Sequence, residues 1–210
     1  RTRMAENRSL LKTNQMTRVK FSGIVLNGGN SSRMGTPKGE MNFLGRPLIE
    51  RSIDALMEAG ASEVVIVGGK PFVAKTKALR FVEDIHPGEG PLGGLVTGLL
   101  NSRLDQAMVL SNDLMSIDGS TIRKILEYGR IGDLAIPMAC GTPQVLTALW
   151  KVSCVEVLEA AFESGLRSLK SVLSKLDVVE ILELDGAKFV NANTQSDIIE
   201  YIASLEEAIE

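Results

Sequence analysis

A glycine-rich stretch that carries two cations is the first part of this sequence with the residue types for chemistry. It runs from Gly28 to Gly39, reads GGNSSRMGTPKG, and includes Arg33 and Lys38. Glycines let backbone N–H groups approach an anion closely, and an arginine and a lysine add the positive charge that a phosphate chain requires. The stretch therefore predicts a phosphate-binding loop, and the alternative is a solvated loop between a strand and a helix.

Neither of two common nucleotide motifs accounts for this stretch. The Walker pattern requires lysine directly after its closing glycine, whereas Gly35 is followed by Thr-Pro-Lys. A literal G-x-G-x-x-G occurs at Gly88, Gly90 and Gly93. It follows the third expected strand instead of the first and lacks a ribose-binding acid at the usual distance, so it is weak evidence for a dinucleotide site.

Two aspartates stand where expected strands end. Asp113 follows the apolar run 107–110, and Asp84 lies at the end of the run 81–85. A carboxylate that faces a phosphate ligand at such a strand end favours Mg²⁺, which prefers oxygen ligands, while a turn or helix-cap aspartate is the alternative for each. His86 is the only histidine of the chain. We therefore interpret it as a loop residue or an incidental ligand contact.

Alternating strands and helices must position these residues. Apolar runs predict strands at 21–26, 63–67, 81–85, 107–110, 133–138, 144–150 and 178–184. Helical spacing predicts helices at 47–60, 72–79, 90–100, from about 120, at 152–164 and 168–175, and from 194 to about 208. Asp118 or Ser120 is the expected cap of the fourth helix, and Asn193 or Thr194 that of the last. The alternation predicts an α/β fold of three layers with a mostly parallel central sheet.

Composition limits the class of protein. The chain has 210 residues, of which 44% are hydrophobic and 23% charged, so it can bury the core of a single domain. Two cysteines and one histidine exclude a disulfide framework and a four-cysteine zinc site. No apolar run is long enough to span a bilayer. We expect one domain over residues 20–210, with a nucleotide-binding half at about 20–115 and a second half at about 116–210.

The charge is unevenly distributed along the chain. Residues 1–20 contain six Lys/Arg and one acid, which leaves 17 basic and 25 acidic residues and a charge of −8 in the remainder. Such a body is a poor binder of nucleic acid, and we expect neither a nucleic-acid nor a membrane partner. Residues 1–19 are expected to form a disordered basic extension. They lack the apolar run of a secretory signal, a transit peptide is the less favoured alternative, and a cytoplasmic location is expected.

Several segments together resemble one family. Leu26–Glu50, which begins LNGGNSSRMGTPKG, is similar to the signature L-A-G-G-x-S-x-R-M-G-x-x-K of the molybdenum cofactor guanylyltransferases. The resemblance extends to Val82–Leu95 (with GPLGGL), to Asp113, and to Phe189–Thr194, which is similar to the family's F-x-N-x-N-T. Residues 144–150 and 167–169 also match similar proteins, so the resemblance covers most of the chain.

The resemblance implies a Rossmann-like nucleotidyltransferase fold and the transfer of GMP from GTP to the terminal phosphate of molybdopterin, with Mg²⁺. It also implies the roles of individual residues. Nucleotide contacts are implied for Leu26, Asn27, Gly28 and Gly29, triphosphate binding and catalysis for Arg33 and Lys38, guanine or ribose recognition for Asp84, Mg²⁺ binding and catalysis for Asp113, and molybdopterin binding for Asn191 and Asn193.

Three positions differ from the family's pattern. Asn27 stands in place of alanine, Val67 in place of a polar nucleotide contact, and Leu114-Met115 in place of the D-x-P that normally follows the metal aspartate. A cytidylyltransferase for the same cofactor and a sugar-phosphate nucleotidyltransferase therefore remain alternatives. So does a catalytically degenerate module that delivers cofactor, with contacts to other cofactor-biosynthesis proteins or apo-molybdoenzymes. A NAD-dependent oxidoreductase ranks third, after the nucleotidyltransferases and the delivery module.

Overall fold

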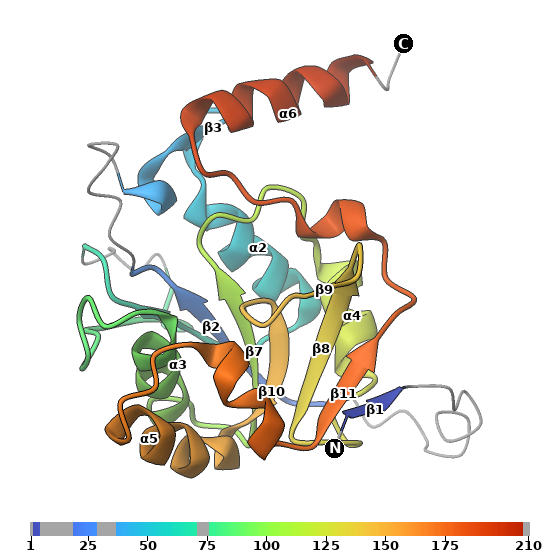
Figure 1. Ribbon diagram of the computed structural model, residues 1–210. Helices are drawn as coiled ribbons and strands as arrows, with labels where there is room; N and C mark the ends of the chain where they lie inside the picture. The colour runs from blue at the N-terminus through green and yellow to red at the C-terminus, as the bar shows by residue number, and fades with distance from the viewer. Residues whose placement is uncertain (1, 5–18, 29–36, 71–75, 208–210) are drawn as a thin grey trace.

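The computed structural model describes residues 2–4, 19–28, 37–70 and 76–207. In this part of the chain, a nine-stranded sheet lies between helices on both of its faces (Figure 1). The strands of this sheet are β1 (Thr2–Met4), β2 (Ser22–Leu26), β5 (Glu63–Val67), β6 (Leu79–Val82), β7 (Gln106–Ser111), β8 (Leu134–Ala139), β9 (Thr142–Pro143), β10 (Ala148–Lys151) and β11 (Val178–Ile181). The predicted mostly parallel α/β fold is confirmed.

The order of the strands identifies the edge of the sheet where a ligand can bind. The order is β1-β11-β8-β10-β7-β2-β5-β6, with β9 paired to β8. All pairs are parallel except those that involve β9 and β10. The chain runs from β2 toward β6 on one side and continues at β7 on the other. Ligands of open α/β sheets bind beyond the carboxyl ends of the strands at such a reversal, which here lies between Leu26 and Ser111.

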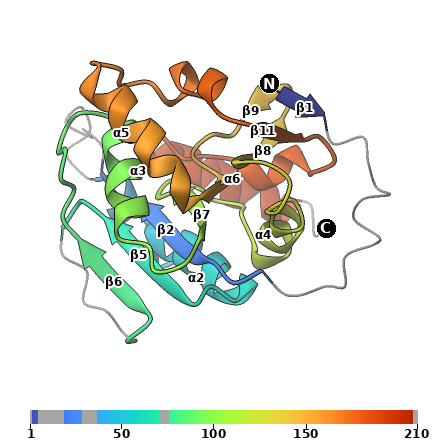
Figure 2. The same cartoon turned by 90° about the horizontal axis from the view of Figure 1, so that it is seen from below.

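Helices lie on both faces of the sheet (Figure 2), and apolar stripes attach them to it. One face carries α2 (Ile49–Ala59) and α4 (Gly119–Leu126), and the other carries α3 (Pro91–Leu100) and α5 (Val155–Glu163). Strand β5 shows why its run is continuously apolar: Val64 and Ile66 pack into the first core cluster, whereas Val65 and Val67 pack into the second. A strand covered on both faces needs apolar residues at every position.

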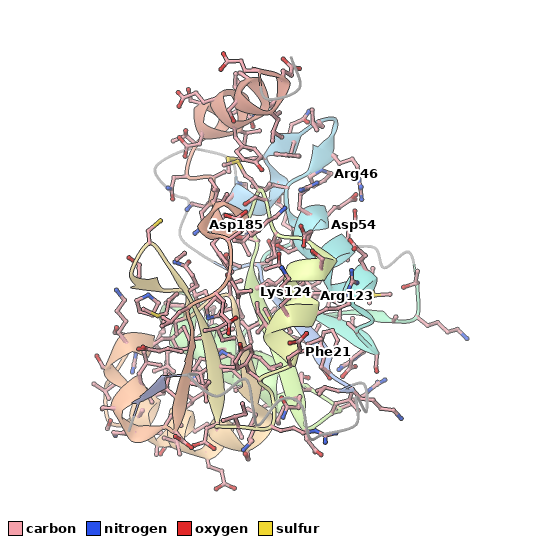
Figure 3. The ribbon with its side chains drawn as sticks, turned by 90° about the vertical axis from the view of Figure 1, so that its right-hand side faces the viewer. Phe21, Arg46, Asp54, Arg123, Lys124 and Asp185 are labelled. Atoms are coloured by element: carbon pink, nitrogen blue, oxygen red, sulfur yellow. The ribbon has the colours of Figure 1, made fainter. Side chains whose placement is uncertain are left out.

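A smaller cluster joins α6 (Gln195–Glu207) to the hairpin of β3 (Asn42–Phe43) and β4 (Arg46–Pro47), at the top of Figure 1. The hairpin turns through Leu44 and Gly45, which both have positive φ. Arg46 fixes the hairpin on α2, because its guanidinium contacts Glu50 at 2.6 Å and Asp54 at 2.9 Å. Figure 3 shows Arg46 and Asp54 next to one another on the surface.

Side-chain caps set two helix starts. Asp118 Oδ1 accepts the Thr121 N–H at 2.8 Å, so Asp118 is the cap of α4. Burial acts to raise the pKa of Asp118. The hydrogen bonds that Asp118 accepts from Lys188, at 2.8 Å, and from Ser120 and Thr121 outweigh burial and lower this pKa. Thr194 Oγ1 accepts the Asp197 N–H at 3.1 Å and caps α6. The side chain of Asn193, the other candidate for this cap, is thereby left to make a different contact.

Three predicted elements differ from the structure in the residues that it describes. Residues 76–79 of the predicted helix 72–79 are not helical, because Leu79 already begins β6, and 71–75 lie outside the described residues. The predicted strand 144–150 begins only at Ala148, after a turn in which Thr147 N–H donates to the Gln144 carbonyl. The predicted helix 168–175 is two 3-10 turns, η3 (Leu169–Ser171) and η4 (Leu173–Lys175). Short apolar runs do not distinguish these alternatives.

Boundaries also differ at other elements. Pro47 belongs to β4, so α2 starts at Ile49. Part of the N-terminal segment, for which no regular structure was expected, forms β1 and pairs in parallel with β11. In the described part of the chain, no helix combines the length and apolarity needed to cross a bilayer.

Candidate active site

Lys38, Asp113 and Asn193 come together at the carboxyl end of β7. Lys38 opens the short 3-10 helix η1 (Lys38–Glu40), and its Nζ lies 3.3 Å from Asp113 Oδ2. The same ammonium donates to Asn193 Oδ1 at 2.7 Å. Three segments that are remote in the sequence therefore meet at one cation. Such a group can hold a phosphate, because it places a positive charge beside oxygen donors for a metal ion.

The carboxylate of Asp113 is held in place from both sides. Ser111 Oγ donates to its Oδ1 at 2.6 Å, and the Asp113 side chain is only 15% exposed. The backbone after β7 pairs with the chain before α6: Ala192 N–H donates to the Asp113 carbonyl at 2.8 Å, and an antiparallel bridge joins Leu114 to Asn191. This pairing brings the predicted Asn191 and Asn193 to the same site.

A second group of functional side chains lies at the end of β2. Asp84 Oδ1 accepts hydrogen bonds from Thr97 Oγ1 at 2.9 Å and from His86 N–H at 3.0 Å. A Cβ placed on Gly28 would lie 3.9 Å from the other oxygen of this carboxylate, and one on Gly94 would lie 3.7 Å from it. An acceptor is thus fixed next to bare backbone at the end of β2. This arrangement suits a ligand that offers hydrogen-bond donors, such as a base or a ribose.

A cavity of about 620 Å³ adjoins Asp113. Its wall combines residues from the carboxyl end of β7, apolar residues before β10, and a cationic rim. The lining residues are Gly90, Pro91, Ser111, Asp113, Pro143, Gln144, Val145, Leu146, Thr147, Arg167, Ser168, Leu169, Lys170 and Asn191. Its size is within the range of small-molecule sites, so it can accept a second substrate next to the Asp113 carboxylate.

Arg167 is held at the rim of this cavity. Its Nε donates to Glu89 Oε2 at 2.7 Å, and its guanidinium lies 3.9 Å from the centre of the Phe162 ring. The ring of His86 also packs on Phe162, at 4.0 Å between centroids. His86 therefore has a packing partner, and it lies in a bend after β6, as the interpretation as a loop residue expects.

The residues singled out in the sequence lie in different places. Lys38, Asp113, Asn191 and Asn193 surround one site, and Gly28 lies near Asp84, while Gly29 and Arg33 lie outside the described residues. Leu26 is buried at the end of β2. Val67 is 1% exposed in the core.

Several supporting residues were missed in the sequence. Ser111, Asn112 and Thr97 hold the functional side chains, and Lys170 lines the cavity. The polar run 111–113 directly after a buried strand was the available signal for the first two. Thr97 gave none, because it lies within an apolar helix and only the fold brings it to Asp84.

The oxygen donors near Asp113 decide what metal could bind. Among the residues that the structure describes, no three His, Cys, Asp or Glu side chains gather as a metal centre. Asp113 offers one carboxylate, with Ser111 Oγ and Asn193 Oδ1 close to it. One carboxylate plus substrate phosphates is the usual set for Mg²⁺, so the residues present fit a metal that arrives with a nucleotide.

The doubly wound sheet and the cation-carboxylate group at its reversal point define a nucleotidyltransferase. A comparison with known proteins specifies the family: the chain belongs to the MobA-like NTP transferase domain family, whose model matches residues 23–179. A molybdenum cofactor guanylyltransferase of Xanthomonas euvesicatoria is 31% identical over 180 residues, which cover 83% of this chain and 90% of that protein. The resemblance seen in the sequence is confirmed.

Solved structures agree on the fold. The molybdopterin-guanine dinucleotide biosynthesis protein A of Archaeoglobus fulgidus superimposes with a TM-score of 0.72 at 24% identity, over 88% of this chain and 99% of that one. A Mycobacterium tuberculosis protein in complex with manganese superimposes with a TM-score of 0.66 at 16% identity, over 89% and 100%.

Proposed function

We propose that this nucleotidyltransferase transfers GMP from GTP to the terminal phosphate of molybdopterin, releasing pyrophosphate and forming molybdopterin guanine dinucleotide. The observation that carries the proposal is the contact of Lys38 with both Asp113 and Asn193. It joins the nucleotide signature to the C-terminal asparagine motif, next to a cavity that Asp113 lines and that is large enough for a second substrate. The guanylyltransferase relative supports the choice of substrates.

The reaction requires little acid-base chemistry from the protein. The terminal phosphate of the acceptor is already ionised at neutral pH, so it can attack the α-phosphorus of GTP without a general base. The bond to the pyrophosphate oxygen breaks as the new phosphoanhydride bond forms in line with it. Positioning and charge neutralisation then account for the rate, and Lys38 is the cation placed to supply both.

Each substrate would use one part of the chain. The nucleotide would lie against Gly28 and Asp84, with its triphosphate toward Lys38 and toward Arg33, which is outside the described residues. Molybdopterin would occupy the cavity, next to Asn191, with Arg167 and Lys170 at its rim. This division assigns the nucleotide to about 20–115 and the acceptor to about 116–210. We also propose a cytoplasmic location for the reaction.

Mg²⁺ would be held by Asp113 and by phosphate oxygens of the nucleotide. When bound there, it would neutralise the charge that develops on the transferred phosphoryl group. Ser111 donates to one oxygen of Asp113 at 2.6 Å, and the other oxygen faces Lys38, where it would be available to the metal ion.

Pyrophosphate release with each nucleoside triphosphate tests the proposal. The protein is incubated with Mg²⁺ and GTP, CTP, ATP or UTP, with and without molybdopterin. We expect release with GTP only when molybdopterin is present. Release with CTP instead would assign a cytidylyltransferase. GTP binding without release under any condition would overturn the enzymatic proposal and favour a cofactor-delivery module.

A further inference from the structure

Asn27 differs from the family's usual alanine, and its side chain lies where three strand ends meet. Its Oδ1 accepts a hydrogen bond from Asn112 Nδ2 at 2.9 Å, and its Nδ2 lies 3.4 Å from the Gly68 carbonyl. Its backbone N–H donates to the Val67 carbonyl at 2.8 Å. The carboxamide thus connects the ends of β2, β5 and β7 in the plane of the sheet.

Two glycines close around this carboxamide. A Cβ on Gly39 would lie 2.5 Å from Asn27 Oδ1, and a Cβ on Gly69 would lie 2.3 Å from Asn27 Nδ2. Real Cβ atoms do not come so close to other atoms, so a side chain at either position would force the Asn27 carboxamide to move. Gly69 also has a positive φ and lies close to the Asn27 backbone oxygen, so its need for glycine does not depend on the carboxamide alone. Gly39 has an ordinary backbone conformation, and its requirement for glycine therefore comes from crowding alone.

The residues that Asn27 contacts are adjacent in sequence to the two catalytic candidates. Gly39 directly follows Lys38, and Asn112 directly precedes Asp113. We infer that Asn27 is a positioning residue, whose carboxamide sets the separation of Lys38 and Asp113 by bonding Asn112 and packing on Gly39. The inference rests on the proposed function. Alanine at position 27 would remove the carboxamide that lies between Gly39 and Asn112.

The alternative is that Asn27 only fills space. A filler would affect stability and leave the catalytic rate unchanged, whereas loss of a spacer displaces catalytic groups that are still present. A displacement of about 1 Å typically costs about 100-fold in rate. The expected signature is therefore a lower kcat with a nearly unchanged KM for GTP.

Steady-state kinetics of Asn27→Ala, Asn112→Ala and the double variant test the role. We expect each single variant to lower kcat about 10- to 100-fold, with KM for GTP changed less than threefold. The double variant should be no slower than the slower single one, because both remove the same contact. Asn101→Ala is the matched control, since its side-chain amide donates to the Thr97 carbonyl of α3 at 2.9 Å. A kcat of Asn27→Ala equal to that of the wild type would overturn the inference.

Thermal unfolding tests the packing without reference to activity. Gly39→Ala should lower the Tm by about 5 °C in the wild-type background, because overpacking of this kind is costly. In the Asn27→Ala background the same change should have a smaller effect, because the shortest approach is removed and those to Asn112 Nδ2 at 3.0 Å and Ile49 Cβ at 3.3 Å remain. An equal loss in both backgrounds would contradict the crowding. A wild-type protein without turnover would refute the proposed function, whereas an active wild type with an equally active Asn27→Ala would refute only the positioning role.

Discussion

Replacement of Lys38 by alanine tests the most important electrostatic contact of the site. The variant removes the ammonium that lies 3.3 Å from Asp113 Oδ2 and 2.7 Å from Asn193 Oδ1. A unit charge at about 3.3 Å from a phosphate oxygen contributes about 5 kcal/mol at an effective dielectric constant of about 20. Lys38 is 31% exposed, so solvent screens part of this energy.

The expected loss is therefore about 3 to 4 kcal/mol of transition-state stabilisation, or about a hundred- to a thousandfold in kcat. The assay is pyrophosphate release at saturating GTP and molybdopterin, with a thermal melt to verify folding. We expect the Tm to change little, because the ion pair is partly solvated.

Lys151→Ala is the matched control. Lys151 pairs with Asp133 at 3.9 Å. It is in register with Gln106 at the start of β7, so it lies at the end of the strands opposite to the site. It should keep the wild-type rate. If Lys38→Ala is folded and turns over within threefold of the wild type, the assigned role of this lysine is refuted.

Three further variants or probes have defined outcomes. Asp113→Asn should lose about a hundred- to a thousandfold in kcat and show a weaker dependence of rate on Mg²⁺; unchanged metal titration would exclude Asp113 as the ligand. Burial acts to raise the pKa of Glu63, but hydrogen bonds from Arg103 N–H, Ser22 and Arg80 outweigh it and lower this pKa. The stabilisation is therefore present above the unfolded pKa and disappears as the pH falls: Glu63→Gln should cost about 2 kcal/mol at pH 7 and progressively less below about pH 4, and a constant difference in urea melts would contradict this. Burial raises the pKa of Cys154 to about 11, so a thiol reagent at pH 8 should label exposed Cys140 in the native state and Cys154 only after unfolding; labelling of both at equal rates would disprove it.

The elements that were predicted well are those whose patterns have a single physical solution. Continuous apolarity at β5 required a strand covered on both faces, and the spacing of Ile49, Ile53 and Leu56 required a helix with one buried face. The segment 168–175 gave no such constraint. Its apolar residues fit a helix, but the chain there forms two 3-10 turns, of which only the first lines the cavity.

The residues of the site could be predicted from the sequence, but their contacts with one another could not. The types and positions of Lys38 and Asp113 indicate phosphate and metal chemistry, and Asn193 belongs to the C-terminal asparagine motif. Their meeting depends on contacts across 75 and 155 residues of sequence. The fold places Lys38 at the end of β7, and the pairing of the C-terminal segment with the chain after β7 brings Asn193 to the same lysine. Likewise, asparagine in place of alanine at Asn27 is visible in the sequence, but its contacts with Gly39 and Asn112 are not.

The fate of the α-phosphate of GTP tests the central claim most directly. The protein is incubated with molybdopterin, Mg²⁺ and GTP labelled with ³²P at either the α or the γ position, and the products are separated. Transfer of GMP predicts that the α label enters a dinucleotide with molybdopterin and that the γ label appears only in pyrophosphate. Retention of the α label in GTP or GDP, or entry of the γ label into molybdopterin, would contradict it.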